Sequence, residues 1–316
     1  MTTVSARNAR FAIVAAFAGI YLIWGTTYLA IALAIKTIPP FISGAARFTI
    51  AAALMFVWLR SRNSKPLAGV NVPLALFCGM LLSGMGNGFV IWAQQGIPSG
   101  IAALIVTAVP VVVLVIDWAF FSKRAPRTQA LAGISIAVAG VATIVLHTRE
   151  LAGHAQPLHL LAMLASVVGW SFGTLLQKRA ASAQTVLSFT FVQMLGGGLF
   201  QLGLSFLNGE WSSFDVSQVS LTSALALGYL VVFGSLIGLN CYLWLLTRVA
   251  AQKVTTYALV NPVVALILGA VVLNERVTPL AATSAVLVLL GVALVLFQEQ
   301  SPRAWWAARR RALSST

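Results

Sequence analysis

The sequence predicts an all-α integral membrane protein with ten transmembrane helices, arranged as two five-helix repeats of opposite orientation. Three observations predict this fold: long apolar runs, a one-sided distribution of Lys and Arg, and glycine and proline positions that match between the two halves. Hydrophobic residues make up 59% of the chain and charged residues 8%. A soluble globular domain carries about 25% charged residues, so most of this protein's surface is expected to face lipid.

Ten apolar runs are long enough to cross a hydrocarbon core about 30 Å thick, which requires about 20 helical residues. The first run has no charge and no small-residue cleavage site, so we interpret it as a span and not as a signal peptide. Pro39-Pro40, Asn208-Gly209 and Thr278-Pro279 supply turn and cap signals between runs. The ten runs are Phe11–Leu33, Phe41–Leu59, Val70–Ala93, Pro98–Phe121, Gln129–Leu146, Pro157–Gln177, Thr185–Leu207, Ser220–Thr247, Val254–Leu273 and Thr278–Phe297.

The distribution of Lys and Arg gives these helices a direction, because cytoplasmic loops carry the excess of basic residues. With ten spans, Lys36, Arg149 and Arg276 lie on one side and Arg47 lies inside a span; the other sixteen of the 20 basic residues lie on the side of the N-terminus. We therefore expect both termini to be cytoplasmic, in the inner (plasma) membrane. The net charge of +14 follows from this topology and does not indicate a nucleic-acid partner.

The two halves share a pattern of glycine and proline. The sequence Val109-Pro110-Val111-Val112 resembles Asn261-Pro262-Val263-Val264, Gly84 and Gly88 match Gly234 and Gly238, and Trp24 matches Trp170. Five helices are an odd number, so a second copy enters the membrane from the opposite side. Inverted repeats of this kind place a binding site between the halves near the midplane. We expect one repeat over residues 11–147, a second over 157–297, and a cytoplasmic basic tail over 298–316 that lies against anionic lipid.

Several stretches resemble bacterial drug/metabolite transporters with two EamA domains. These stretches are Tyr21-Leu22-Ile23-Trp24-Gly25-Thr26-Thr27-Tyr28, Ala46-Arg47-Phe48, Pro98-Ser99-Gly100-Ile101-Ala102-Ala103, Ala226-Leu227-Gly228-Tyr229-Leu230, Tyr257-Ala258-Leu259-Val260-Asn261-Pro262-Val263-Val264 and Asn274-Glu275. The resemblance covers residues 11–297 and implies a ten-helix inner-membrane carrier that exports metabolites, amino acids or drugs. Lys123 occupies the position matched to Glu275, where many members carry an acidic residue.

Two charged residues fall inside the predicted helices. An Arg in a span costs roughly 2.5–3.5 kcal/mol on insertion scales, so Arg47 is expected to contact an anionic substrate group such as a carboxylate, or else to extend toward the outer headgroups. Asp117 is a possible coupling group for protons, with an ion pair to Lys123 or Arg124 as the structural alternative. Capping of a helix is the favoured role for Glu275.

Aromatic and amide side chains complete the candidate substrate-binding set. Amides within a span need partners, and aromatic residues near the middle of a span provide an apolar wall. Interhelical bonds and interfacial belts are the structural alternatives. Together with Arg47, the predicted substrate-binding residues are Trp24, Tyr28, Asn87, Trp92, Trp170, Asn240, Trp244, Tyr257 and Asn261.

The function that follows is a secondary transporter that exports small molecules by alternating access, with membrane lipids as its other partners. Neither Cys78 nor Cys241 has metal-ligand spacing, and no metal or cofactor is expected. An intramembrane enzyme would need paired carboxylates, an HExxH or a GxSxG motif, none of which is present. A receptor or structural membrane protein is the other alternative, and the sequence specifies neither a monomer nor a dimer.

Overall fold

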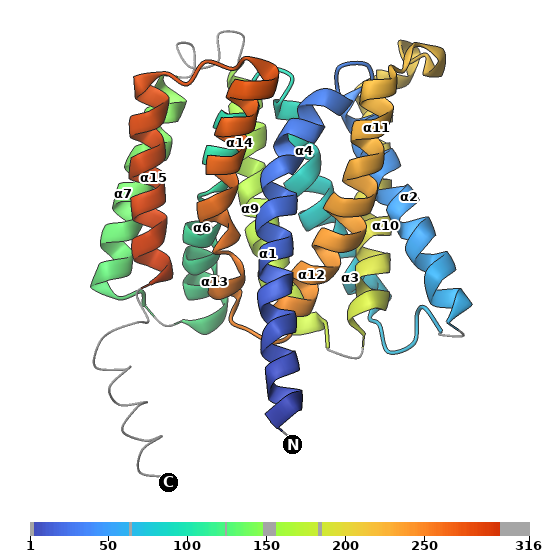
Figure 1. The fold of residues 1–316 in the computed structure, drawn as a ribbon, viewed down its shortest axis with the longest axis horizontal. Coiled ribbons are helices and arrows are strands. Elements are labelled where there is room, and N and C mark those ends of the chain that lie inside the picture. The colour runs from blue at the N-terminus through green and yellow to red at the C-terminus, as the bar shows by residue number, and fades with distance from the viewer. Residues whose placement is uncertain (1–2, 63–64, 124, 148–155, 183–184, 298–316) are drawn as a thin grey trace.

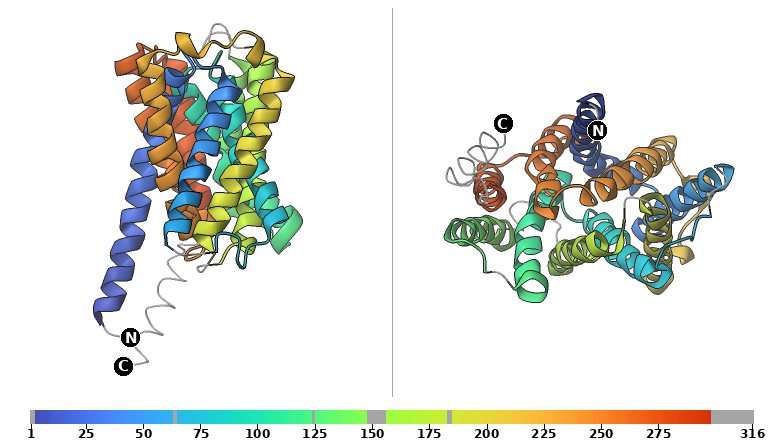
Figure 2. Two further views of the ribbon diagram at one scale, coloured as in Figure 1. Left: turned by 90° about the vertical axis from the view of Figure 1, so that its right-hand side faces the viewer. Right: turned by 90° about the horizontal axis from the view of Figure 1, so that it is seen from below.

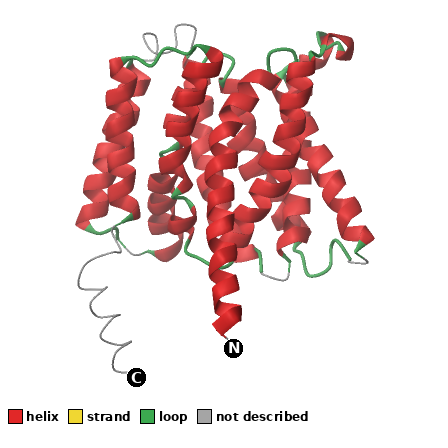
Figure 3. Ribbon diagram, viewed as in Figure 1, coloured by secondary structure: helices red, strands yellow, loops and turns green. Residues whose placement is uncertain are grey.

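The computed structural model describes residues 3–62, 65–123, 125–147, 156–182 and 185–297. Within these residues the fold is entirely helical, without a strand (Figure 3). Eight helices are long and apolar enough to cross a membrane, and two shorter apolar helices, Thr128–Ile144 and Tyr257–Leu273, accompany them. The prediction of an all-α fold with multiple apolar, membrane-length helices is thereby confirmed.

The elements follow the predicted runs to within a few residues. In chain order they are α1 (Thr3–Ala34), α2 (Pro40–Ser61), α3 (Val72–Gly79), η1 (Met80–Asn87), α4 (Gly88–Ala93), α5 (Ser99–Val106), α6 (Val109–Ile116), η2 (Asp117–Ser122), α7 (Thr128–Leu146), α9 (Pro157–Ala180), α10 (Val186–Leu207), η3 (Glu210–Ser212), η4 (Val216–Gln218), α11 (Leu221–Tyr229), η5 (Leu230–Ile237), α12 (Gly238–Leu246), α13 (Ala251–Val254), α14 (Tyr257–Leu273) and α15 (Pro279–Leu296). The fourth run, Pro98–Phe121, is interrupted between α5 and α6, and the ninth run, Val254–Leu273, corresponds to α14 preceded by the short α13.

The helices extend between two faces of the molecule (Figure 1). We name the face where α1 begins the lower face and the face where α1 ends the upper face. Helix α15 ends at the lower face, and the two side views agree on this arrangement (Figures 1 and 2). Seen from below, the helices surround a common centre, with α7 and α15 paired at one edge (Figure 2).

Two glutamates cap helices that are distant in the sequence. The Glu210 carboxylate accepts hydrogen bonds from the backbone N–H of Phe41 (3.1 Å) and Ile42 (2.8 Å), at the start of α2. The Glu275 carboxylate accepts from Ser99 N (2.7 Å) and Gly100 N (3.2 Å), at the start of α5. Capping was expected for Glu275, but its helix is α5 and not the following α15. The cap of α15 is Thr278, whose hydroxyl accepts from Ala281 N at 3.1 Å.

Burial and hydrogen bonding have opposite effects on the pKa of Glu210. Burial raises the pKa of its carboxyl above the ordinary value, whereas hydrogen bonds from Ile42, Phe41 and Asn208 act in the opposite direction. The charged oxygens satisfy N–H groups that a helix start otherwise leaves without partners, and a negative group there also interacts favourably with the helix dipole. This carboxylate therefore joins the loop after α10 to the start of α2.

Two π-helical segments interrupt the third and eighth predicted helices. They are η1 (Met80–Asn87) and η5 (Leu230–Ile237), equal in length and separated by an offset of 150 residues. In η1 the carbonyl of Ser83 accepts a hydrogen bond from the Gln201 amide of α10 at 2.7 Å. A neighbouring helix thus satisfies backbone that the irregular turn exposes, as apolar surroundings require. Segments of π-helix frequently occur at functional sites.

A second correspondence concerns Lys123. Among the described non-glycine residues, only Lys123 (φ 55°) and Asn274 (φ 56°) have positive φ, and each directly follows a proline-containing span. By this backbone feature Lys123 corresponds to Asn274, whereas the match of Pro110 with Pro262 pairs Lys123 with Glu275. On the backbone correspondence the position matching Glu275 is Arg124, which lies outside the described residues.

Candidate substrate-binding cavity

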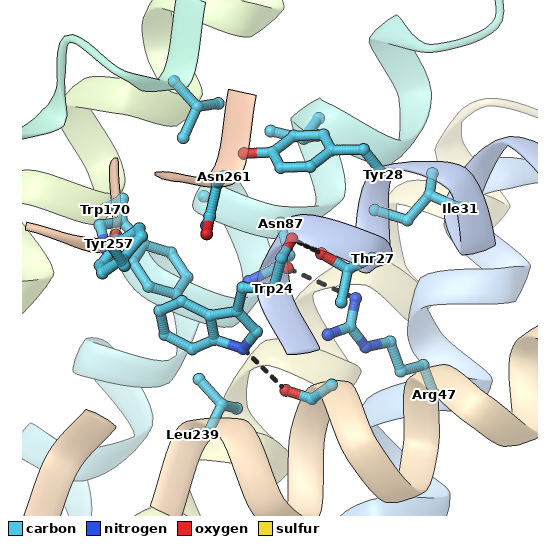
Figure 4. A pocket seen from close by; sticks show the side chains of 14 residues that line it. Trp24, Thr27, Tyr28, Ile31, Arg47, Asn87, Trp170, Leu239, Tyr257 and Asn261 are labelled. Atoms are coloured by element: carbon cyan, nitrogen blue, oxygen red, sulfur yellow. Dashed lines mark hydrogen bonds between the residues drawn. The ribbon is translucent and has the colours of Figure 1, made fainter. Parts of the chain in front are cut away.

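A cavity of about 50 Å³ lies in the interior of the bundle, where two hydrophobic clusters meet (Figure 4). Tyr28, Ile31 and Val90 belong to the cluster that includes the end of α1 and most of α5. Trp24, Leu239 and Tyr257 belong to the cluster that extends toward the lower face. The full lining is Trp24, Thr27, Tyr28, Ile31, Arg47, Gly86, Asn87, Val90, Val106, Trp170, Gly234, Leu239, Tyr257 and Asn261.

Irregular segments of four helices border this cavity. Gly86 and Asn87 come from the π-segment η1, and Gly234 comes from η5. Val106 is the last residue of α5, before the break that precedes α6, and Tyr257 is the first residue of α14. Transporters commonly form their sites from helices that are interrupted at membrane depth. The breaks in these four helices therefore lie beside the cavity.

Arg47 is the one charged side chain among the residues that line the cavity. It is 2% exposed. Its Nε donates to Ser235 Oγ at 2.9 Å, its Nη1 donates to Asn87 Oδ1 at 3.4 Å, and its guanidinium lies 4.8 Å from the ring centre of Phe48. All of these partners are neutral. Five N–H donors and a full positive charge are thus held beside a cavity without a carboxylate on its described lining, which favours an anionic ligand.

Aromatic rings form the side of the cavity that faces the lower cluster. The Trp24 ring lies 5.4 Å from Trp170 at 84° and 4.9 Å from Tyr257 at 87°, both edge-to-face. Its Nε1 donates to Gly234 O at 3.2 Å, which fixes the ring against η5. Trp170 Nε1 is buried near the hydroxyls of Tyr242 and Tyr257 but has no hydrogen bond of good geometry. The wall therefore combines apolar surface with an available donor.

The side chain of Asn261 lies above Trp24 in the view of Figure 4. In the orientation that its neighbours favour, its nitrogen donates to the carbonyls of Tyr257 and Tyr21, both at 3.2 Å. Asn261 precedes Pro262, which provides no N–H to the helix. Asn261 therefore joins α14 to α1 at the level of the cavity.

Two residues of α1 that line the cavity were not among the predicted binding residues. Thr27 and Ile31 line the cavity beside Trp24 and Tyr28, and the four residues follow the i, i+3, i+4, i+7 spacing of one helix face. That periodicity was available in the sequence. Val90, Val106 and Leu239 were also missed, because an apolar residue in an apolar helix provides no distinguishing signal.

The structure places seven of the ten predicted binding residues on the cavity lining and three elsewhere. Trp92 stacks on Phe41 (6.5 Å, 11°) and lies 4.8 Å from His159. It follows Asn87 by five positions, which rotates it by about 140° around the helix. Asn240 and Trp244 line a separate apolar groove between α1 and α12. The Asn240 amide donates to Leu236 O, and Arg248 lies over the Trp244 ring at 3.9 Å.

Asp117 begins the π-segment η2, half-buried and away from the cavity lining. The Lys123 ammonium donates to the carbonyl of Ala119, and Arg124 lies outside the described residues. The ion pair weighed for Asp117 is therefore not formed with Lys123. Its role in coupling stays a prediction.

Comparisons with known proteins agree with a membrane-embedded transporter. The model of the EamA-like transporter family matches residues 10–146 and again 157–297. An inner membrane transporter of Escherichia coli K12, YedA, described as uncharacterized, is 33% identical over 282 residues, which cover 87% of this chain and 88% of the relative. A probable amino-acid metabolite efflux pump of the same organism is 28% identical, covering 88% of this chain and 92% of that protein.

A solved crystal structure has the same fold, with a TM-score of 0.64 at 20% identity, and the match covers 92% of this chain and 99% of that one. The fold and the cavity define a helical membrane transporter. The chain belongs to the EamA-like transporter family, with two copies of the family domain. Its resemblance to drug/metabolite transporters, inferred from short sequence stretches, is confirmed.

Proposed function

We propose that this protein is a secondary transporter that exports small carboxylate-bearing metabolites by alternating access. The observation that supports this substrate class is Arg47, a buried cation with only neutral partners beside an interior cavity. A carboxylate accepts two parallel N–H bonds from a guanidinium, and the aromatic wall of Trp24, Trp170 and Tyr257 accommodates an apolar remainder. A relative named as an amino-acid metabolite efflux pump agrees with this class, since amino acids carry a carboxylate.

The size of the cavity supports a mechanism with conformational change. At about 50 Å³, the cavity holds about three to five water-sized groups, which is fewer than most amino acids need. Residues of both apolar clusters line it. Helices must therefore separate before a metabolite enters, and separation of one cluster at a time is alternating access.

We further propose that all ten apolar helices cross the membrane as two inverted repeats, over residues 11–147 and 157–297. Helices α7 and α14 have 19 and 17 residues, which correspond to about 28 and 26 Å and approach the thickness of the hydrocarbon core. The π-helical segments η1 and η5 have the same length and lie 150 residues apart, which supports the duplication.

The same proposal places the lower face in the cytoplasm, with both termini there. The described Lys and Arg of the loops gather at the lower face, whereas Lys36 and Arg276 lie at the upper face with Glu210 and Glu275. Relatives named as inner membrane transporters support the inner membrane as its location, with small molecules and lipids as its partners. Both rival functions, a receptor or structural protein and an intramembrane enzyme, are disfavoured by the family.

Counterflow in proteoliposomes tests the function. Vesicles preloaded with a mixture of unlabelled L-amino acids are expected to accumulate labelled amino acids, and methyl esters of the same compounds are expected to compete poorly because they lack the carboxylate. Arg47→Ala is expected to weaken apparent affinity on the order of 30-fold or more, since truncating one partner of a buried charge pair costs about 2 kcal/mol or more. Arg62→Ala, at an exposed Arg near the end of α2, is the matched control.

Arg47→Lys separates charge from geometry. It keeps the positive charge but loses the planar fork, so its affinity is expected to lie between those of the wild type and Arg47→Ala. Equal counterflow by the wild type and Arg47→Ala would contradict the anion site. Absence of counterflow for every compound, with folded protein in the vesicles, would contradict transport of this class.

A further inference from the structure

A second polar pocket lies at the upper end of the bundle, outside the cavity. It has a volume of about 330 Å³ and lies between the end of α1, the loop after α4, the start of α5 and the end of α14. Lys36, Gln94, Gln95, Ser99 and Glu275 supply its polar groups. The volume falls within the range of about 300–1,000 Å³ for small-molecule sites.

Two buried side chains of this pocket lack hydrogen-bond partners among the described residues. Gln94 is 9% exposed, and neither its Nε2 nor its Oε1 has a partner. Ser99 is 1% exposed, and its Oγ has none. A buried polar group without a partner costs about 1–3 kcal/mol, so three such atoms at one pocket are costly unless a ligand satisfies them. Glu275 differs, because its carboxylate already accepts from Ser99 N and Gly100 N.

The pocket lies on the upper side of the interior cavity. Ala32, on its wall, directly follows Ile31 of the cavity lining. Gln94 follows Asn87 by seven positions, which places the two amides on the same face of the helix, about 10 Å apart along its axis. Gln94 therefore lies on the upper side of Asn87, between the cavity and the upper face.

The pocket shares a cation, an amide and a hydroxyl with the cavity, and differs from it by the carboxylate of Glu275. In the cavity a cation, Arg47, stands with the amide of Asn87 and the hydroxyl of Ser235. In the pocket a cation, Lys36, stands with the amide of Gln94 and the hydroxyl of Ser99. We propose that this pocket is a second substrate site on the exit path, which binds small carboxylic acids that also carry an amino, hydroxyl or amide group. This inference rests on the proposed function and adds to it a site at the upper face.

Protection of an introduced cysteine tests the site. Cys78 and Cys241 are replaced by Ala, Ala32→Cys is introduced, and proteoliposomes are labelled with a membrane-impermeant maleimide. We expect L-serine to slow labelling at least threefold and methylamine, which lacks a carboxylate, to leave the rate unchanged. Lys36→Gln and Gln94→Leu are expected to abolish protection. Lys65→Gln, an exposed lysine at the lower face, is expected to retain it.

Two further measurements separate this proposal from its alternatives. Gln94→Leu removes two unpaired polar atoms, so the thermal midpoint is expected to stay equal or rise; a fall in the midpoint with protection intact would show a structural amide and overturn the proposal. Protection is expected to survive Arg47→Ala. Protection lost in Arg47→Ala but retained in Lys36→Gln would place the ligand in the cavity and overturn the second site. Protection without any counterflow would contradict the proposed transport and leave this site standing.

Discussion

At Gly238 the missing side chain determines where Trp24 lies. A Cβ at this position would lie 2.4 Å from Trp24 Nε1, closer than any van der Waals contact. The indole that donates to Gly234 O and contacts Trp170 and Tyr257 can therefore occupy its place only beside a glycine. A methyl group here requires the indole ring to move.

We predict that Gly238→Ala reduces the rate of counterflow at least tenfold, because the displaced indole fills space that substrate needs. The matched control is Gly228→Ala, a helical glycine of α11 at which a Cβ meets no atom within 4 Å. Alanine favours a helix by about 1 kcal/mol over glycine, so the control is expected to fold and transport normally. Equal rates for the two variants would show that Gly238 does not position Trp24.

At the scale of single residues, the sequence indicates which polar and aromatic side chains lie within the spans, but not toward which neighbouring helix each one points. Asn87 and Asn240 were both predicted to bind substrate, because amides within a span need partners. The structure places Asn87 on the cavity with Arg47, and Asn240 on a separate apolar groove with Trp244. An offset of 150 residues aligns Asn87 with Ile237, so the two amides were never at matching positions. Proximity in sequence did not determine rotation about the helix.

At the scale of elements, the upper face depends on two carboxylates that cap helices across the chain. Glu210 follows α10 and caps α2, and Glu275 follows α14 and caps α5. In both cases a loop of the second half holds the start of a helix in the first half. Opening of the upper face that separates the halves would therefore break these hydrogen bonds.

We predict that Glu210→Gln and Glu275→Gln each lower the free energy of unfolding by about 1 kcal/mol, because each variant removes the negative charge and one acceptor from a helix start. Thermal unfolding in detergent measures the change. Asp215→Asn alters an exposed cap of the short η4 segment and is expected to change the midpoint little. If the glutamate variants match this control, the caps contribute no measurable stability.

At the scale of the whole molecule, alternation of the loops between two faces leads to a topology that labelling can test. In a background without native cysteines, Ser213→Cys at the upper face is expected to react with an impermeant maleimide in intact cells. Ser61→Cys at the lower face is expected to react only after permeabilisation. Both serines are exposed. The reverse pattern would contradict the proposed cytoplasmic location of the lower face.

Much of the architecture could be predicted from the sequence. Helix bounds agree with the apolar runs to within a few residues, because hydropathy is a local property and lipid forces each span to satisfy its own backbone. Two interruptions are the exceptions: Pro98–Phe121 breaks at Thr107 and Ala108 between α5 and α6, and α13 ends at Val254, with two residues between it and the start of α14. Hydropathy did not indicate the residues at which these helices restart.

The sequence by itself determined the membrane class, the family, the extent of the helices and the side of the bundle on which each loop lies. The tertiary structure decided which side chains share a cavity, since that depends on helix rotation and on contacts between residues far apart in the chain. In the folded protein Arg47 contacts Ser235 and Asn87, Asn240 lines a different groove, and Glu275 caps α5. Hydropathy determines how deep a residue lies in the membrane, whereas the packing of the helices against one another determines which residues a polar side chain contacts.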